Sequence, residues 1–385
     1  MKGTFMLDVA IIGCGITGAV TAYELSRYKL NVAVFESEND VSMGTTRTNG
    51  GVIHAGYDPK PGTLMAKLNI EGAQMTGDLC RDLDVPYKQT GSLVVAFSQS
   101  ELQTLQVLYE QGIKNGVKHL ELLDGEQTRN LEPLLSPDIC GSLLAPTAAI
   151  VNPWEYARAL AEVAVINGVR LYLSCGVLAI HKLQEGFELL TPKGSFITKK
   201  IINAAGLYAD TVHEMAGAKE FTIQPNRGEY FVLDKSEGKA VSRVVFQCPS
   251  AEGKGVVIGP TPHGIMLIGP NAQDVPLQEA VTVTTDGLRF VAEKARKTFP
   301  CVNLTKSIRN FAGSRAIPDT GDFIIAESKT AKGFINLAGI KSPGIASAPA
   351  IGKMAVDILA GTGMKLEHKK DFNGQRQRMH FEELS

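Results

Sequence analysis

The chain has 385 residues, more than most single domains contain, so two lobes are expected. Its 39 Lys and Arg residues balance 40 Asp and Glu residues, and the net charge of -1 argues against nucleic acid or an anionic membrane as a bulk partner. Hydrophobic residues make up 44% of the chain, yet no stretch approaches the roughly 18 apolar residues of a membrane-spanning helix.

The cysteines lie far apart in the sequence, at Cys14, Cys80, Cys140, Cys175, Cys248 and Cys301. No two of them form a C-x-x-C pair, so the sequence predicts no zinc, iron–sulfur or other metal site. Scattered single cysteines are typical of reduced core residues in a cytosolic protein. Residues 1–7 are too short and too mixed for a signal peptide. We therefore expect a cytoplasmic protein, with peripheral membrane contact left open.

The first 35 residues read as strand, glycine-rich turn, helix and strand. The apolar runs at Asp8–Ile12 and Asn31–Phe35 predict buried strands, and Ile16–Tyr28 predicts the helix between them. Strands of parallel sheets are apolar throughout because helices cover both faces of the sheet. The unit is the beginning of a Rossmann-type domain.

The turn carries a phosphate-binding pattern. Gly13, Gly15 and Gly18 match G-x-G-x-x-G, which provides a tight turn, close backbone approach to a pyrophosphate, and close packing of helix on strand. The helix N-terminus then faces the negative charge. Glu36 follows Gly18 by 18 residues and is placed to accept hydrogen bonds from ribose hydroxyls. The alternative, a tight turn without a ligand, does not account for Glu36.

The middle of the chain predicts mixed structure. Val41–Ala55 reads as a loop that approaches a ligand. Helices are expected at Glu71–Leu83, Glu101–Gly112 and Pro153–Asn167, and strands at Ser92–Phe97, Val169–Leu173 and Lys200–Asn203. Between about residues 216 and 310, short apolar runs separated by Gly and Pro predict an antiparallel sheet in a second lobe.

The C-terminal part returns to buried strands at Phe323–Ile325 and Phe334–Leu337, followed by a helix at Ala350–Leu359. Gly339 and Gly344 permit close backbone approach just before this helix, and Ser347 or the preceding turn can cap it. FAD enzymes often combine an N-terminal G-x-G-x-x-G with such a distant closing segment, whereas the alternative is an ordinary Gly/Pro loop. Lys365–His380 reads as a polar, basic tail.

Several stretches resemble one known family. Residues 51–56, followed by Asp58-Pro59, resemble the flavin-facing loop of the FAD-dependent glycerol-3-phosphate oxidase/dehydrogenase family, within the D-amino-acid oxidase superfamily. Further matching pieces lie at residues 201–206, 227–228, 253–255, 311–315 and 341–344. L-2-hydroxyglutarate dehydrogenases share much of the loop around His54, so they are similar as well.

The resemblance implies roles for single residues. His54 matches a histidine near the flavin that takes the hydroxyl proton, Lys254 and Arg315 match cationic substrate positions, and Ser342 matches a residue beside flavin and substrate. For Lys254 and Arg315 the alternative is an ordinary surface charge. The expected cofactor-binding residues are Gly13, Gly15, Gly18, Glu36, Thr46, Asn49, Gly50, Gly206, Gly339, Lys341, Ser342, Pro343 and Gly344. Gly50 departs from the serine of some oxidases, and no Cys or His in residues 340–344 could tether the flavin.

The fold class expected is α/β, with a Rossmann-type FAD-binding lobe and a second lobe built on an antiparallel sheet. The FAD-binding domain combines residues 1–88, 149–215 and 311–366, the substrate domain combines 89–148 and 216–310, and 367–385 form the tail. The function implied is hydride transfer from a small anionic substrate, sn-glycerol 3-phosphate, to non-covalent FAD. The alternatives are an L-2-hydroxy acid, a secondary amino acid, or a flavin-binding subunit without catalysis. The acceptor is oxygen, a quinone or an electron-transfer protein.

Overall fold

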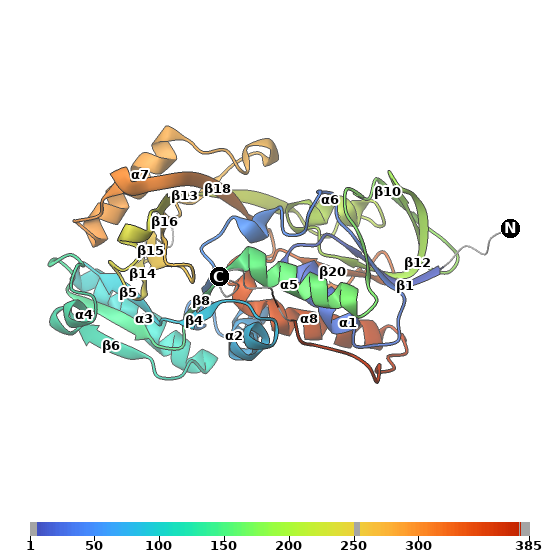
Figure 1. The fold of residues 1–385 in the computed structure, drawn as a ribbon, viewed down its shortest axis with the longest axis horizontal. Helices are drawn as coiled ribbons and strands as arrows, with labels where there is room; N and C mark the ends of the chain where they lie inside the picture. Colours follow the sequence, from blue (N-terminus) through green and yellow to red (C-terminus); the bar gives the residue numbers. More distant parts are fainter. Residues whose placement is uncertain (1–5, 250–254, 377, 379–385) are drawn as a thin grey trace, which may run out of the picture.

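The computed structural model describes residues 6–249, 255–376 and 378. Two sheets organise these residues, one of eight strands and one of nine. Figure 1 shows them side by side along the long axis, with β1 and β12 toward one end and β5 and β6 toward the other. The expected α/β fold with two lobes is confirmed.

The eight-stranded sheet has the order β10-β11-β12-β1-β2-β9, with β20 added beside β12 and β19 beside β20. Its central pairs β12–β1, β1–β2, β2–β9 and β12–β20 are parallel, as the apolar strands predicted. The strands are β1 (Met6–Ile12), β2 (Val32–Phe35), β9 (Arg170–Tyr172), β10 (Ala179–Lys182), β11 (Phe187–Thr191), β12 (Gly194–Asn203), β19 (Ile324–Glu327) and β20 (Phe334–Ala338).

Both faces of this sheet are covered, which explains why β1 is apolar from Val9 to Ile12. Val9 and Ile11 point into a core shared with the helices α1, α5 and α8, while Ala10 and Ile12 point into a second core on the opposite face. The second core includes residues of β10, β11 and the short helix α6. The helices are α1 (Ile16–Leu25), α5 (Pro153–Ile166), α6 (Ala209–Glu214) and α8 (Gly344–Gly361).

The nine-stranded sheet is antiparallel except for one pair. Its order is β17-β13-β16-β15-β14-β5-β7-β6, with β18 paired to β13. The predicted antiparallel sheet is confirmed, and its single parallel pair joins β14 to β5. The strands are β5 (Ser92–Ala96), β6 (Glu121–Asp124), β7 (Gly141–Ala145), β13 (Ile223–Leu233), β14 (Val244–Gln247), β15 (Val257–Pro260), β16 (Met266–Gly269), β17 (Gln273–Asp274) and β18 (Ser307–Pro318).

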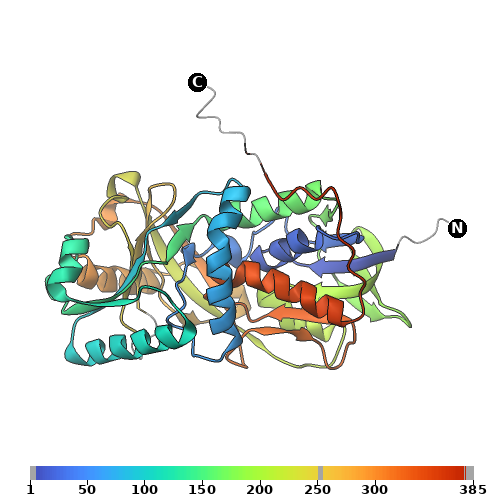
Figure 2. The ribbon, with the colours of Figure 1, turned by 90° about the horizontal axis from the view of Figure 1, so that it is seen from below.

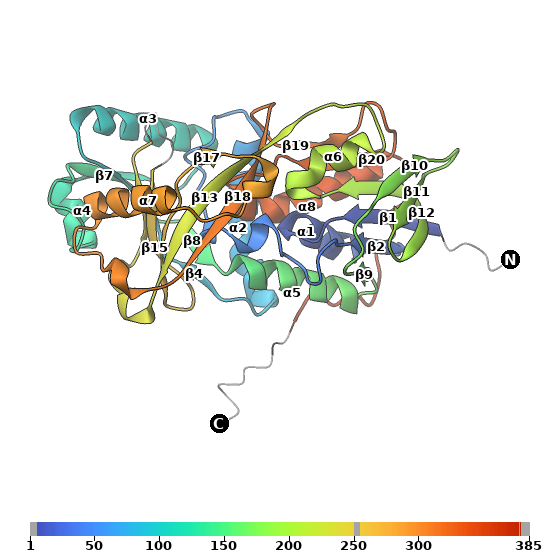
Figure 3. The ribbon, with the colours of Figure 1, turned by 90° about the horizontal axis from the view of Figure 1, so that it is seen from above.

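Helices flank the second sheet, and its longest strands point toward the first. The helices are α3 (Gln99–Asn115), α4 (Gly125–Leu131) and α7 (Thr285–Thr298). Figure 3 shows β13 and β18 running side by side from below α7 toward α6. The domain boundaries stay a prediction. One of them, predicted between residues 310 and 311, falls inside strand β18.

A third, small sheet and the helix α2 lie between these two regions. The sheet has the order β3 (Val52–Ile53), β8 (Ala149–Val151) and β4 (Tyr87–Gln89). The helix α2 (Leu64–Asp82) begins seven residues before the predicted Glu71. Its first amides, those of Leu64 and Met65, donate to the carboxylate of Asp322, 2.7 and 2.9 Å away, so a distant residue stabilises this start.

The last helix also starts earlier than predicted. Helix α8 begins at Gly344 rather than at Ala350 and contains Pro349 in its first turns. Ser347 does not cap it, because this hydroxyl lies inside the helix and donates to the Pro343 carbonyl. Figure 2 shows α2 crossing α8, where the backbone of Ala346 would lie 2.2 Å from any Cβ at Gly72.

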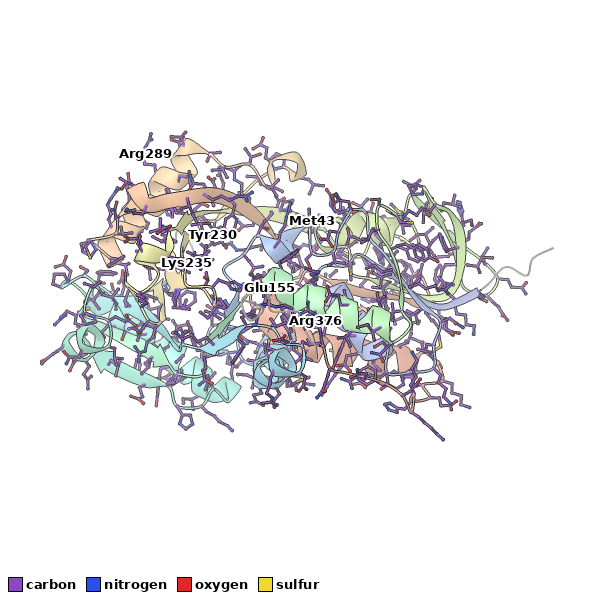
Figure 4. The ribbon with its side chains drawn as sticks, viewed as in Figure 1. Met43, Glu155, Tyr230, Lys235, Arg289 and Arg376 are labelled. Atoms are coloured by element: carbon purple, nitrogen blue, oxygen red, sulfur yellow. The ribbon has the colours of Figure 1, made fainter. Side chains whose placement is uncertain are left out.

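The C-terminal tail packs onto the first lobe. Phe372 contacts the ring of Tyr23 edge-on, with centroids 6.0 Å apart, and the Arg27 guanidinium lies over Phe372. Arg376, which is labelled in Figure 4, pairs with Glu162 of α5 at 2.5 Å between Nε and Oε2. Residues 377 and 379–385 of the predicted tail lie outside the described residues.

Candidate functional site

The glycine turn after β1 is sterically obligatory. Gly13 has φ +94°, and a Cβ there would lie 2.6 Å from the Ala204 carbonyl oxygen. A Cβ at Gly18 would lie 2.0 Å from the Gly13 oxygen, so Gly18 permits the packing of helix on strand. The Gly15 N-cap makes no side-chain hydrogen bond, and the first turn of α1 contains no acidic residue. The turn therefore offers backbone amides and a helix N-terminus to an anion.

Glu36 lies at the C-terminal end of β2 and is only 8% exposed. Its carboxylate accepts the backbone N–H of Cys14 at 2.6 Å and that of Glu38 at 2.9 Å. These bonds fix the carboxylate beside the glycine turn. Burial, with a contribution from Glu36, raises the pKa of the Cys14 thiol, so this cysteine stays neutral.

A cavity of about 840 Å³ runs from the glycine turn to the second sheet. Met43, from the loop after β2, and Tyr230, from β13, line it from the two lobes (Figure 4). The predicted residues that line this cavity are Gly13, Gly15, Glu36, Thr46, Asn49, Gly50, His54, Gly206, Arg315, Lys341, Ser342, Pro343 and Gly344. Segments from both ends of the chain thus form one continuous site.

Two predicted glycines do not line the cavity. Gly18 packs under the turn, and Gly339 has φ +65° with Pro318 only 2.7 Å from any Cβ built on it. Both are therefore required by backbone packing rather than by contact with a ligand. Gly50 differs from them, because the nearest atom to a Cβ there is Val52 Cγ2 at 3.8 Å, so a serine would fit.

The loop at residues 41–55 is built to approach a ligand. Thr46 Oγ1 accepts the N–H of Ile16 at 2.9 Å, which ties the loop to the first turn of α1. The Asn49 amide donates to the carbonyl of Thr46 and accepts the N–H of Gly51. Short elements inside the predicted loop, the 3-10 turn Thr45–Arg47 and β3, hold it in this shape.

These residues fit a bound FAD. Ser314 lines the cavity, and its buried Oγ has no hydrogen-bond partner among the described residues. At Gly313, any Cβ would stand 2.0 Å from the Thr48 carbonyl, so the strand and the loop meet closely around the cavity. FAD can form hydrogen bonds along its length with three groups of this cavity. These are the unpaired hydroxyl of Ser314, the backbone amides of the glycine turn and the buried carboxylate of Glu36.

His54 and Ser342 meet although 288 residues separate them. His54 follows β3, Ser342 precedes α8, and His54 Nε2 lies 3.2 Å from Ser342 Oγ. Asn69 of α2 donates to the carbonyl of His54 at 2.7 Å and holds its backbone. The Phe246 ring packs 5.5 Å from the imidazole. Neither Asn69 nor Phe246 was singled out from the sequence, because their contacts with His54 exist only in the fold.

Arg315 lies at the junction of this cavity with a second one of about 590 Å³. Lys341 and Ser342 also line both cavities, so the second cavity opens directly onto the His54 side. Lys254, the other predicted cation, lies outside the described residues, although the following Gly255 lines both cavities.

Tyr230 is a site residue that the sequence did not reveal. It is 7% exposed, stacks on Phe311 with centroids 4.7 Å apart, and lines the large cavity. Burial raises the pKa of its hydroxyl, an effect that the nearby Arg315 charge opposes, so the hydroxyl stays protonated at neutral pH. By contrast, Arg227, part of a motif match, is buried away from the cavity and pairs with Glu229 at 3.3 Å.

The comparison with known families decides the class of this site. Residues 8–358 match the family model described as FAD dependent oxidoreductase. The chain belongs to this family. The predictions of an FAD-dependent oxidoreductase and of FAD as cofactor are thereby confirmed, as is the resemblance seen in the sequence motifs.

Individual relatives align over most or nearly all of the chain. A glycerol 3-phosphate dehydrogenase of Caloramator mitchellensis is 50% identical over 372 residues, covering 97% of this chain and 78% of that protein. The structure of an L-alpha-glycerophosphate oxidase of Mycoplasma pneumoniae with FAD bound has a TM-score of 0.93 at 34% identity, covering 97% and 99% of the two chains. The mitochondrial L-2-hydroxyglutarate dehydrogenase of Homo sapiens is 31% identical over 70% of this chain and 61% of its own length.

The described residues contain no group of three or more His, Cys, Asp or Glu side chains arranged to hold a metal ion. Among these same residues, no helix is both long and apolar enough to cross a membrane.

Proposed function

We propose that this FAD-dependent oxidoreductase oxidises sn-glycerol 3-phosphate to dihydroxyacetone phosphate. The observation that carries the proposal is that His54 lies 3.2 Å from Ser342, while Ser342 and Arg315 both line the junction of the large cavity with the second one. A proton acceptor and a cation at one junction suit a small hydroxylated anion. The glycerol 3-phosphate dehydrogenase and the glycerophosphate oxidase described above support this substrate over an L-2-hydroxy acid or a secondary amino acid.

Bound FAD supplies the hydride acceptor for the carbinol carbon of the substrate. In our proposal the amides of the glycine turn would hold the pyrophosphate of FAD, and the Glu36 carboxylate would accept hydrogen bonds from the ribose hydroxyls. The segment before α8 would contact the flavin ring. The N-terminus of α8 lies at that segment and would stabilise negative charge on the ring. The remaining cofactor contacts are assigned to Thr46, Asn49, Gly50, Gly206, Lys341, Ser342, Pro343 and Gly344.

Each residue around the junction of the two cavities has a separate role in the proposed reaction. His54 accepts the hydroxyl proton at Nε2 as the hydride leaves the adjacent carbon. Before substrate binds, Ser342 Oγ lies 3.2 Å from this nitrogen, and the substrate hydroxyl takes over that contact, while the Asn69 bond to the His54 carbonyl fixes the loop that carries the imidazole. Arg315 binds the phosphate, and Lys254 is assigned the same task. Orienting the anion places the carbinol carbon and its hydroxyl toward His54.

Product formation tests the substrate. Purified holoenzyme with an artificial electron acceptor is expected to form dihydroxyacetone phosphate from sn-glycerol 3-phosphate and to use glycerol poorly, because glycerol lacks the anion that Arg315 binds. Glycerol as efficient as its phosphate would reject the anion site. Faster turnover of L-2-hydroxyglutarate or proline would transfer the proposal to those substrates.

The FAD is expected to be tightly held but non-covalent. No cysteine or histidine occupies residues 340–344, and the neutral thiol of Cys14 is a poor nucleophile. Acid precipitation should therefore release all the yellow colour into the supernatant as FAD. Flavin that stays with the pellet, or FMN in the supernatant, would contradict this expectation.

We infer that electrons leave the reduced flavin through a separate acceptor, either a quinone or an electron-transfer protein. We also infer that the protein works in the cytoplasm, where a quinone acceptor would require peripheral contact with the membrane. The six cysteines suggest no cluster in the chain itself, and Gly50 replaces the serine of some oxidases. Anaerobically reduced enzyme mixed with air-saturated buffer should be reoxidised more slowly than it turns over with a quinone analogue. Reoxidation by oxygen at the rate of turnover, with stoichiometric peroxide, would identify an oxidase instead.

A further inference from the structure

Arg315 is aligned with two polar side chains on neighbouring strands. In the sheet, Asn226 of β13 stands opposite Arg315 of β18 on one side and opposite Asp274 of β17 on the other. Arg315 Nη1 donates to Asn226 Oδ1 at 2.8 Å, and Asn226 Nδ2 donates to Asp274 Oδ1 at 2.8 Å. A carboxylate can only accept, so Asp274 requires the nitrogen of the Asn226 amide and turns its oxygen toward Arg315.

A backbone carbonyl accepts hydrogen bonds from another edge of the same guanidinium. Nη1 and Nη2 of Arg315 both lie 3.4 Å from the carbonyl oxygen of Asn271 and donate to it. These contacts and the Asn226 bond account for three of the five N–H groups of a guanidinium. The other two, on Nε and Nη2, share one edge, and the structure gives that edge no hydrogen bond within the described residues.

The unused edge has the geometry of an oxyanion receptor. Two parallel N–H groups match the two oxygens of a carboxylate or phosphate, and such bidentate pairs are stronger and more selective than a point charge. Arg315 lines both cavities, and His54 lines the larger one. A Cβ at Gly228 would lie 3.1 Å from Arg315 Nη2 and 2.6 Å from Pro270, so the strand leaves the guanidinium just enough room in this orientation.

We propose that Asn226, oriented by Asp274, is a positioning residue that aims the Nε–Nη2 edge of Arg315 at the anionic group of the substrate. The inference rests on the proposed function for the role of Arg315. Asn226 thereby sets affinity for small oxyanion-bearing alcohols over neutral ones, while the proton transfer at His54 does not depend on it. The effect belongs in binding and not in the chemical step.

The test compares Asn226→Ala holoenzyme with wild type in two measurements. The KM for sn-glycerol 3-phosphate should rise about tenfold with kcat within about twofold, since one hydrogen bond to a charged group is lost. The Kd of inorganic phosphate, read from the perturbed flavin spectrum, should rise by a similar factor. Asn310→Ala is the matched control, because Asn310 is an exposed asparagine of β18 whose side chain contacts Ser307.

A double variant separates positioning from a general structural effect. In Arg315→Ala enzyme, adding Asn226→Ala should change neither constant by more than about twofold, because the partner is already absent. Asp274→Ala, at an exposed position, serves as a second variant if Asn226→Ala folds poorly, and should raise both constants in the same direction. Equal effects of Asn226→Ala with and without Arg315 would overturn the proposal.

The phosphate measurement keeps this inference separate from the proposed function. If wild type binds phosphate and Asn226→Ala weakens that binding, the inference stands even where sn-glycerol 3-phosphate fails to reduce the enzyme, and the proposed function alone falls. If wild type binds the anion normally and both variants match it, the positioning role is wrong. Wild type that binds no phosphate would likewise refute the assignment of the free edge.

Discussion

Replacing His54 with glutamine is expected to slow reduction of the flavin by sn-glycerol 3-phosphate by roughly 10²–10⁴-fold. Glutamine keeps a polar contact with Ser342, whose hydroxyl lies 3.2 Å from His54 Nε2, but it cannot take up the substrate proton. FAD should remain bound, because the glycine turn and Glu36 lie at the other end of the cavity. Anaerobic rapid mixing, followed in the visible flavin band, measures the rate.

The control for His54 is His181→Gln, because His181 is exposed on β10, away from the cavity lining. The flavin of this variant should be reduced by sn-glycerol 3-phosphate at the wild-type rate. A His54→Gln rate within about twofold of wild type would leave this histidine a structural role only, and the proton acceptor would have to be sought elsewhere at the junction.

Loss of the Arg315 side chain is expected to cost about 2–5 kcal/mol in kcat/KM for sn-glycerol 3-phosphate, the range for truncating one partner of a close charge pair. Most of it should be seen as a higher KM, because the phosphate is bound similarly before and during hydride transfer. Arg315→Lys should recover only part of the kcat/KM that Arg315→Ala loses, since a lysine keeps the charge but lacks the two parallel N–H donors of arginine. Steady-state kinetics over a wide substrate range separate the two constants.

Arg289→Ala provides the comparison for Arg315, because Arg289, labelled on α7 in Figure 4, is an exposed arginine whose ion-pair partner is Asp286 of the same helix. Its kinetics should match wild type. Unchanged kcat/KM in Arg315→Ala would remove Arg315 from the substrate site and would leave the anion to Lys254.

Local patterns sufficed for the first unit of the chain. Apolar runs and the glycine spacing identified the strand, turn, helix and strand of residues 6–35, although β1 also pairs with the distant β12. The starts of α2 and α8 were missed for a different reason. Asp322 stabilises the first turn of α2 from 258 residues away, and α8 begins at Gly344 although Pro349 lies five residues further along. A local pattern cannot contain such contacts.

The same distinction applies to the site. Residues in glycine-rich loops, such as His54 and Ser342, stand out because those loops match a family pattern residue by residue. Tyr230 and Asn226 belong to an ordinary strand, and the register of β13 with β18 places Asn226 opposite Arg315 and Tyr230 opposite Phe311. Sequence alone does not give a register between strands about 90 residues apart, because many alignments bury the same apolar faces.

Anaerobic mixing of the FAD-loaded enzyme with single substrates tests the central claim most directly, because it requires no acceptor. We expect sn-glycerol 3-phosphate to bleach the flavin within the turnover time and to yield one dihydroxyacetone phosphate per FAD, while glycerol, L-2-hydroxyglutarate and proline leave it oxidised on that timescale. Bleaching by L-2-hydroxyglutarate or proline but not by sn-glycerol 3-phosphate would contradict the account.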